Sequence, residues 1–207
     1  MQSQYTQSEI VELTKRVTKS YAIPVADMTL TDRRNTRLNC DQILTERGLK
    51  LVHDDPDQLV IRDVLPNNDL GVGIGGPVVG AGTAEDWLDQ IAGVAGVEHQ
   101  YFSSLLAIDR VIGFYGISLE SAPPSISRIR LTLGPASPQV RGSFQLEKLY
   151  TRLETVAFFS EVVIYIRNDT IRCMVMPRLA YAALTERIAL LGRVIETIGQ
   201  VVSTPSG

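Results

Sequence analysis

The spacing of apolar residues predicts a helix at the beginning of the chain. It opens with a capping box, Thr6-x-x-Glu9, and Pro24 ends it. Its apolar face is formed by residues at helical spacing: Ile10, Leu13, Val17 and Tyr21.

A second helix is predicted from about Asp32 to Arg47. We expect Leu38 and Leu44 to face inward, and Gly48 to supply a left-handed cap at its end. After Gly48 the helical period stops.

A β-hairpin is predicted next. The apolar segments 49–52 and 58–65 bracket residues 53–57, a turn that contains one histidine, three aspartates and one proline.

Residues 70–82 have the most unusual composition of the chain, with six glycines and one proline. This segment is either a flexible linker or an extended arm. Thr83 then caps a short predicted helix that contains Trp87 and Ile91. A further helical or irregular segment is expected from Val97 to Ile108.

From Arg110 onward the pattern is typical of β-strands, expected at residues 111–119, 127–134, 143–150, 156–166 and 170–176. In the second of these, Ile129, Leu131 and Leu133 point to one face, and Arg128, Arg130 and Thr132 to the other. Residues 155–166 are apolar on both faces, which predicts a central strand covered on both sides. Residues 167–169 form its turn.

The segment 184–198 fits either a helix or a kinked strand. Gly192 would weaken a helix interior and a sandwich needs a closing strand, so the strand is favoured. The predicted class is α+β, with a helical N-terminal part, residues 1–108, followed by an antiparallel β-sandwich or jelly-roll-like domain, residues 109–207.

The composition is sufficient for a hydrophobic core that needs no disulfide bonds or structural metal, because 44% of the 207 residues are hydrophobic. Cys40 and Cys173 are far apart and are expected to be reduced, packed thiols. The sequence lacks the pattern of a secretory signal or a membrane span, so we expect a protein that is made in the cytoplasm and does not enter a membrane.

The formal net charge is −3, which argues against a general nucleic-acid binder. Residues 1–108 hold nine basic and fifteen acidic side chains, giving −6, and residues 109–207 hold eleven and eight, giving +3. These opposite charges either stabilise the packing of the two halves or guide head-to-tail contact between subunits.

No catalytic, cofactor or metal site is predicted. The glycine run lacks the Lys-Ser/Thr pair and the strand-helix context of a phosphate loop. His53 and His99 lack the orienting carboxylate or second ligand that catalysis or metal binding needs. The acidic clusters at residues 54–57 and 67–69 do not have the EF-hand spacing and are good turn formers.

Two arginine groups, one at residues 33–37 and one formed by Arg128 and Arg130, have no interleaved aromatic residues. They therefore do not predict a single-strand nucleic-acid platform or sequence-specific binding. We expect these arginines to pair with carboxylates such as Asp32, Asp41 or Glu147.

Three segments of the C-terminal half, residues 126–134, 144–150 and 158–165, resemble β-rich virion structural proteins of tailed bacteriophages. The resemblance consists of an I-R-x-x-x-G strand ending, an F-x-L-E-K-L-Y segment and a Y-F-S-x-P-V-V-Y-like strand. This chain departs from the last pattern, with Phe158 in place of tyrosine and Val162 in place of proline. The resemblance implies a decoration, minor capsid or tail-associated subunit, located in the virion and present in many symmetric copies.

The leading hypothesis is thus a non-enzymatic structural protein that associates with itself and with other structural proteins. The candidate interaction residues are Gly71, Gly73, Gly75, Gly76, Trp87, Arg128 and Arg130. Two alternatives stay open: a small-ligand or nucleotide-binding enzyme that uses the Gly71–Gly82 loop, and a cytoplasmic regulator that binds one partner protein.

Overall fold

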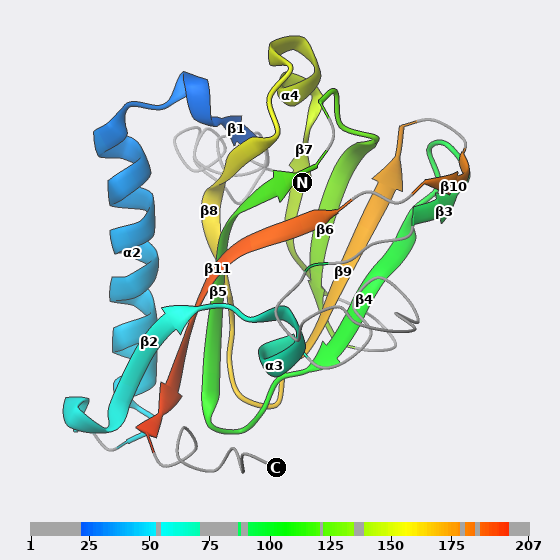
Figure 1. Cartoon of the computed structure of the whole chain (residues 1–207). Coiled ribbons are helices and arrows are strands. Elements are labelled where there is room, and N and C mark those ends of the chain that lie inside the picture. Colours follow the sequence, from blue (N-terminus) through cyan, green and yellow to red (C-terminus); the bar gives the residue numbers. More distant parts are fainter. Residues whose placement is uncertain are drawn as a thin grey trace, which may run out of the picture.

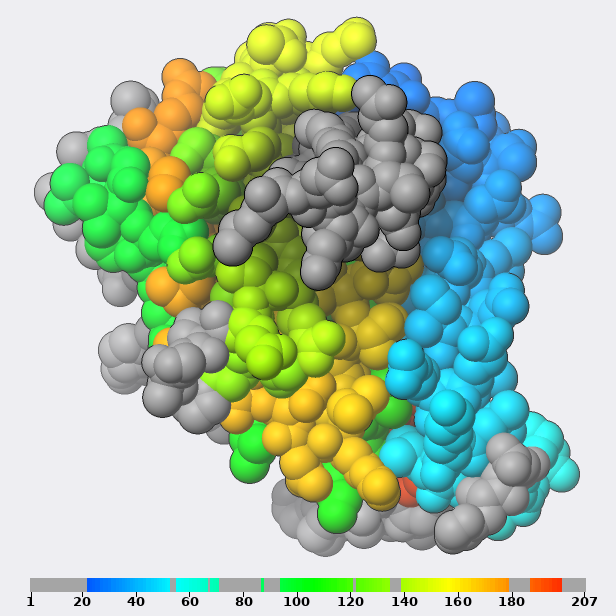
Figure 2. Space-filling model, turned by 180° about the vertical axis from the view of Figure 1, so that it is seen from behind, coloured from blue at the N-terminus to red at the C-terminus, as the bar shows by residue number. Residues whose placement is uncertain are grey.

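The computed structural model describes residues 22–52, 55–70, 87, 91–120, 122–134, 139–178, 181–184 and 187–198. These residues form three layers: one long helix, a five-stranded antiparallel sheet and a four-stranded antiparallel sheet (Figure 1). The predicted α+β class with a β-sandwich is confirmed. Seen from behind, the helix runs along one side of the molecule, beside the strands of the sandwich (Figure 2).

The five-stranded sheet, called sheet 1, has the order β1-β8-β5-β11-β2. Its strands span Ala22–Pro24 (β1), Val156–Tyr165 (β8), Arg110–Leu119 (β5), Ile188–Thr197 (β11) and Leu59–Asp63 (β2). The four-stranded sheet, sheet 2, has the order β4-β9-β6-β7. Its strands span His99–Leu105 (β4), Thr170–Pro177 (β9), Ile126–Leu133 (β6) and Gln139–Gln145 (β7).

Short elements complete the described part of the chain. They are two 3-10 turns, η1 (Val25–Asp27) and η2 (Pro56–Gln58), two short helices, α3 (Pro66–Leu70) and α4 (Glu147–Arg152), and a separate pair of strands, β3 (Ile91–Gly93) and β10 (Tyr181–Leu184).

The main core lies between the two sheets. Alternate residues of β9 are buried, whereas residues 111–117 of β5 are all buried. Phe144 of β7 stacks on Phe159 of β8 with ring centroids 3.9 Å apart. Both rings are almost fully buried, so this aromatic pair joins sheet 2 to sheet 1.

Strand β8 has the predicted two covered faces. Phe159 and Tyr165 point into the main core, while Phe158, Val162 and Ile164 pack on the opposite side with residues of the long helix.

The long helix, α2, spans Leu30–Leu49 and covers the outer face of sheet 1. A capping box starts it: the Thr29 hydroxyl accepts a hydrogen bond from the Asp32 N–H, and the Asp32 carboxylate accepts one from the Thr29 N–H. Its buried residues are Cys40, Leu44 and Gly48, which lie four residues apart on one face.

Two expectations for α2 were wrong. Leu38 is exposed, because it lies two residues away from the stripe that Cys40 and Leu44 define. Gly48 is not a left-handed cap but a buried helical residue. A Cβ there would lie 2.6 Å from Ile195 Cδ1, so glycine is needed for the close approach of α2 to β11.

Long-range pairing changed several local predictions. The expected hairpin around residues 53–57 does not form, because β2 pairs with β11 at the other end of the chain. The segment from Val97 to Ile108 contains strand β4, which pairs with β9. Residues 143–150 are strand only as far as Gln145 and then form α4. Ile91, which the predicted short helix included, belongs to β3, and the rest of that predicted helix, apart from Trp87, lies outside the described residues.

The segment 188–197 is a strand, as the sequence favoured, and its pairing with β5 shifts register between Leu191 and Gly192. The proposed division between residues 108 and 109 falls between β4 and β5. Strand pairing crosses it in β1 with β8, β2 with β11, β3 with β10 and β4 with β9, so described residues on both sides of the division share both sheets. The predicted helix at residues 6–21 lies outside the described residues.

Both cysteines are buried thiols. The Cys40 Sγ donates a hydrogen bond to the Gly113 carbonyl at 3.7 Å, and burial raises the pKa of this thiol to about 12. We expect neither thiol to react with dithionitrobenzoate at pH 8 in the folded protein, and both to react in guanidinium chloride. Rapid modification of one thiol without denaturant would contradict this packing.

Candidate functional site

Four strands of sheet 1 begin or end together at one end of the molecule. Thr197 of β11 lies opposite Leu59 of β2, and Glu196 lies opposite Arg110 of β5. On the other side of β5, Ile112 lies opposite Tyr165 of β8. This register brings the start of β2 and β5 and the end of β11 and β8 to the same edge, at the bottom of Figure 1.

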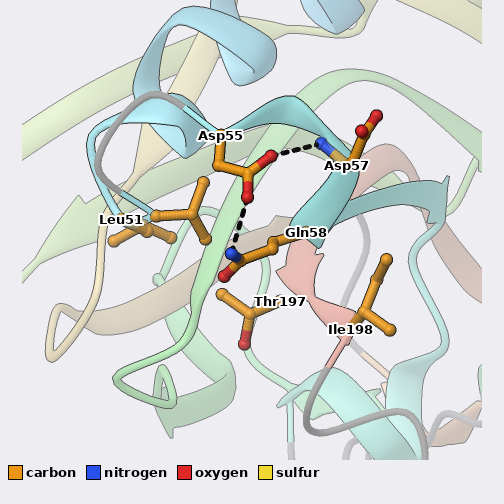
Figure 3. A pocket seen from close by; sticks show the side chains of 7 residues that line it. Leu51, Asp55, Asp57, Gln58, Thr197 and Ile198 are labelled. Atoms are coloured by element: carbon orange, nitrogen blue, oxygen red, sulfur yellow. Dashed lines mark hydrogen bonds between the residues drawn. The ribbon is translucent and has the colours of Figure 1, made fainter.

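A pocket of about 780 Å³ opens at this edge, where α2, η2 and β11 end or begin. It is lined by Leu51, Val52, Asp55, Asp57, Gln58, Thr197 and Ile198. The lining combines an aliphatic wall with two carboxylates, as Figure 3 shows. Such a surface suits a group that is partly apolar and positively charged.

The loop around η2 is held by its own hydrogen bonds. The Asp55 carboxylate accepts a bond from the Asp57 N–H at 3.1 Å and one from the Gln58 side-chain amide at 2.7 Å. The Asp57 side chain points away from the other labelled side chains in Figure 3 and is exposed. It forms no ion pair with any described residue.

Two turns lie beside the pocket edge and are tied to one another. The Leu106 N–H donates to the Asp169 carbonyl at 2.9 Å, and the Asn168 N–H donates to the Leu106 carbonyl at 3.1 Å. These bonds join the β4–β5 turn to the β8–β9 turn, whose residues 167–169 were correctly predicted as a turn. Asn168 has φ of 63°, a left-handed conformation that asparagine tolerates.

These joined turns expose large apolar side chains. Ile108 is 63% exposed and Ile166 is 45% exposed, and Leu105, at the end of β4, is 68% exposed. Arg167 follows Ile166 and is exposed as well. We call Ile108, Ile166 and Arg167 the tip.

A buried charge network supports the same end of the molecule. The Asp69 side chain is fully buried and accepts two hydrogen bonds from Arg62, both at 2.7 Å, and one from Arg110 at 3.0 Å. Glu196 accepts a bond from the Arg62 Nε at 2.7 Å and lies 3.1 Å from the Arg110 Nε. The Leu65 N–H also donates to Asp69, at 2.6 Å.

This network joins β2, α3, β5 and β11. Hydrogen bonds to Asp69, followed by those to Glu196, raise the pKa of Arg62 above its usual value, although burial opposes the shift. Each charge has an opposite charge within hydrogen-bond distance, so the network is a structural clamp that fixes the edge next to the pocket and the tip.

The sequence-predicted interaction residues lie elsewhere. Arg128 and Arg130 lie on the outer face of sheet 2, and both donate to Glu98, Arg128 at 2.7 Å. Their partner is therefore Glu98 and not Asp32, Asp41 or Glu147, because the loop before β4 brings Glu98 over β6. Trp87 is partly buried and packs against the main core. Gly71, Gly73, Gly75 and Gly76 lie outside the described residues.

The other arginine group also has partners that sequence reasoning did not identify. Arg33 donates to the carbonyls of Val25 and Met28, and Arg37 lies 3.5 Å from Asp63. Asp41 pairs with Arg193 at 2.8 Å. These contacts hold α2 to the chain before it and to the edge of sheet 1.

His99 accepts a hydrogen bond from the Val94 N–H and belongs to strand β4. Among the described residues, no three His, Cys, Asp or Glu side chains gather in a way that could hold a metal ion. Within the same ranges, every helix is too short or too polar to cross a bilayer.

The sequence pattern did not predict the pocket or the tip. Ile108, Ile166 and Ile198 read as ordinary apolar residues next to turns, and nothing local shows that they remain exposed. Comparison with known protein families, with curated proteins and with solved structures found no match to this chain.

Proposed function

We propose that this chain is a structural subunit that acts through contacts with copies of itself and with other structural proteins, as a component of a virion. The observation that carries the proposal is the joined pair of turns, which exposes Ile108 and Ile166 beside an acidic pocket. Burial of one such side chain contributes about 1.5–3 kcal/mol.

A surface of this kind is better suited to contact with another protein than to exposure to water. Isolated exposed apolar residues are common, but here they lie on turns that hydrogen bonds hold in place, next to a clamped sheet edge. A rigid surface loses little conformational entropy on binding, so more of the burial energy is available for association. The C-terminal resemblance to β-rich virion proteins supports the same role.

Native mass spectrometry and light scattering over a range of protein concentrations test the proposal. We expect dimers or larger assemblies whose fraction increases with concentration, and electron microscopy of concentrated protein should show regular particles. A protein that remains strictly monomeric at high concentration would contradict self-association.

The size of the pocket favours a small-ligand site as a second candidate function. Its volume of about 780 Å³ lies within the range of small-molecule sites, roughly 300–1,000 Å³. The carboxylates would select an amine or guanidinium group attached to an apolar body. A thermal-shift screen with such compounds, repeated on Asp57→Lys, separates binding in this pocket from binding elsewhere.

A further inference from the structure

We propose that two copies of this chain associate end to end about a twofold axis, each inserting its tip into the pocket of the other. In this arrangement Arg167 of one copy enters the pocket beside Asp55 of the partner subunit, with Asp57 of the partner subunit at the outer rim. The inference rests on the proposed function and specifies which surface makes the contact between copies.

The position of the two surfaces favours a twofold contact. The pocket includes Thr197 at the end of β11, and the tip follows Tyr165 at the end of β8. Only β5 separates these strands in sheet 1, so two strand spacings, roughly 10 Å, lie between them. Two complementary surfaces at the same end of a molecule can both be filled by one second copy, which closes a dimer.

The charges of the two surfaces are complementary. Arg167 is exposed and forms no ion pair with any described residue, and the same is true of Asp57. Asp55 is held in place by the Asp57 N–H and the Gln58 side chain, with its carboxylate oriented before any partner arrives. Carboxylate recognition by arginine uses planar paired hydrogen bonds, for which a fixed carboxylate is favourable.

The apolar groups of the two surfaces match as well. Ile108 and Ile166 of the tip are large and exposed, and the pocket presents Leu51 and Ile198. Contact between them removes apolar surface from water on both copies, and the contact occurs twice in a twofold dimer. Arginine is enriched among the residues that contribute most of the binding energy at the centre of protein interfaces.

Variants that reverse the charges of Arg167 and Asp57 test this contact. Arg167→Glu places a carboxylate opposite Asp55 and Asp57 at both copies of the contact. Asp57→Lys places a second positive charge beside Arg167 and leaves Asp55 as the single carboxylate of the pocket. We expect each variant alone to raise the dimer Kd about 100-fold. The double variant Arg167→Glu/Asp57→Lys restores opposite charges and should recover most of the affinity. Sedimentation velocity and native mass spectrometry provide the Kd and the number of copies.

Mixing the two single variants gives the sharpest result. In a dimer of one copy of each variant, one contact keeps Arg167 opposite Asp55 and Asp57, and the other pairs the new carboxylate at position 167 with the new ammonium at position 57. Each variant with itself has an unfavourable charge pair at both contacts. We therefore expect an equimolar mixture to form dimers that contain one copy of each variant. A mixture that instead forms alternating chains longer than two would overturn the twofold arrangement.

Two control variants show whether the effect is specific to this end. Arg187→Glu changes the same charge at the other end of β11, next to Ile188, and Val94→Asn removes an exposed apolar side chain before β4. Neither should alter the Kd, whereas Ile108→Asn should raise it. If the chain assembles but Arg167→Glu and Asp57→Lys keep the original Kd, this inference fails and the proposed function stands. If the chain does not self-associate, both fail.

Discussion

Replacement of Asp69 by alanine is expected to lower the free energy of unfolding by about 3–5 kcal/mol. The change removes the carboxylate that Arg62 and Arg110 share and leaves two guanidinium groups partly buried without it. It also leaves the Leu65 N–H without its acceptor. Urea unfolding followed by the fluorescence of Trp87, the single tryptophan, measures the effect.

Asp63→Ala is the matched control for Asp69→Ala. Asp63 also accepts from an arginine, Arg193 at 2.8 Å, but its side chain is 67% exposed. Solvent screens such a pair, so we expect a loss below about 1 kcal/mol. Equal losses in the two variants would show that burial of the Asp69 network contributes nothing to its strength.

Phe144→Ala is expected to lower the free energy of unfolding by about 3–5 kcal/mol as well. Phe144 is fully buried, stacks on Phe159 and joins the two sheets, so its removal leaves a cavity between the sheets beneath strand β7. Closure of that cavity would require movement of one sheet toward the other. Urea or thermal unfolding of the variant provides the measurement.

Val140→Ala controls for changes in strand β7 itself. Val140 lies in the same strand as Phe144, but it is exposed, and we expect a change within about 0.5 kcal/mol. A loss for Val140→Ala as large as that for Phe144→Ala would assign the effect to strand propensity and not to the aromatic contact between sheets.

Sequence pattern was most reliable where a segment has one strong period. The alternation in residues 127–133 placed Ile129 and Leu131 in the core, and both are fully buried. It was wrong for Thr132, which is also buried, where the pairing with β7 shifts register after Leu131. The two-sided apolar pattern of residues 155–166 identified β8 as a strand covered on both faces. In both cases the side chains themselves carry the information, because burial on one or two faces dictates which positions must be apolar.

Prediction was wrong where a distant strand supplied the partner. Residues 58–65 looked like half of a local hairpin, but hydrogen bonds with β11 give β2 its place at the edge of sheet 1. The apolar residues of β4 fit a helix as well as a strand. Backbone pairing with β9 is what makes this segment a strand. A short apolar segment fits both helical and strand periodicity, so pairing with a distant strand decides which structure it adopts.

The candidate site was even harder to predict from the sequence than the strand pairing. Sequence reasoning selected Arg128 and Arg130 as interaction residues, and the fold uses both to bind Glu98. It did not select Ile108 or Arg167, because single residues next to turns have no distinctive pattern. Their importance arises from position, since two turns far apart in sequence become neighbours at the end of sheet 1.

Local sequence pattern was enough to predict the α+β class, the position of α2 and the central strand β8, and it favoured a strand over a helix for residues 188–197. These features depend on local periodicity and on the conformational limits of glycine and proline, which each segment carries within it. Only the tertiary structure decided the order of strands, the clamp around Asp69 and the pocket beside the tip. These features depend on contacts between segments far apart in the chain, such as Arg62 and Glu196, which are 134 residues apart, and such contacts exist only once the sheets have formed.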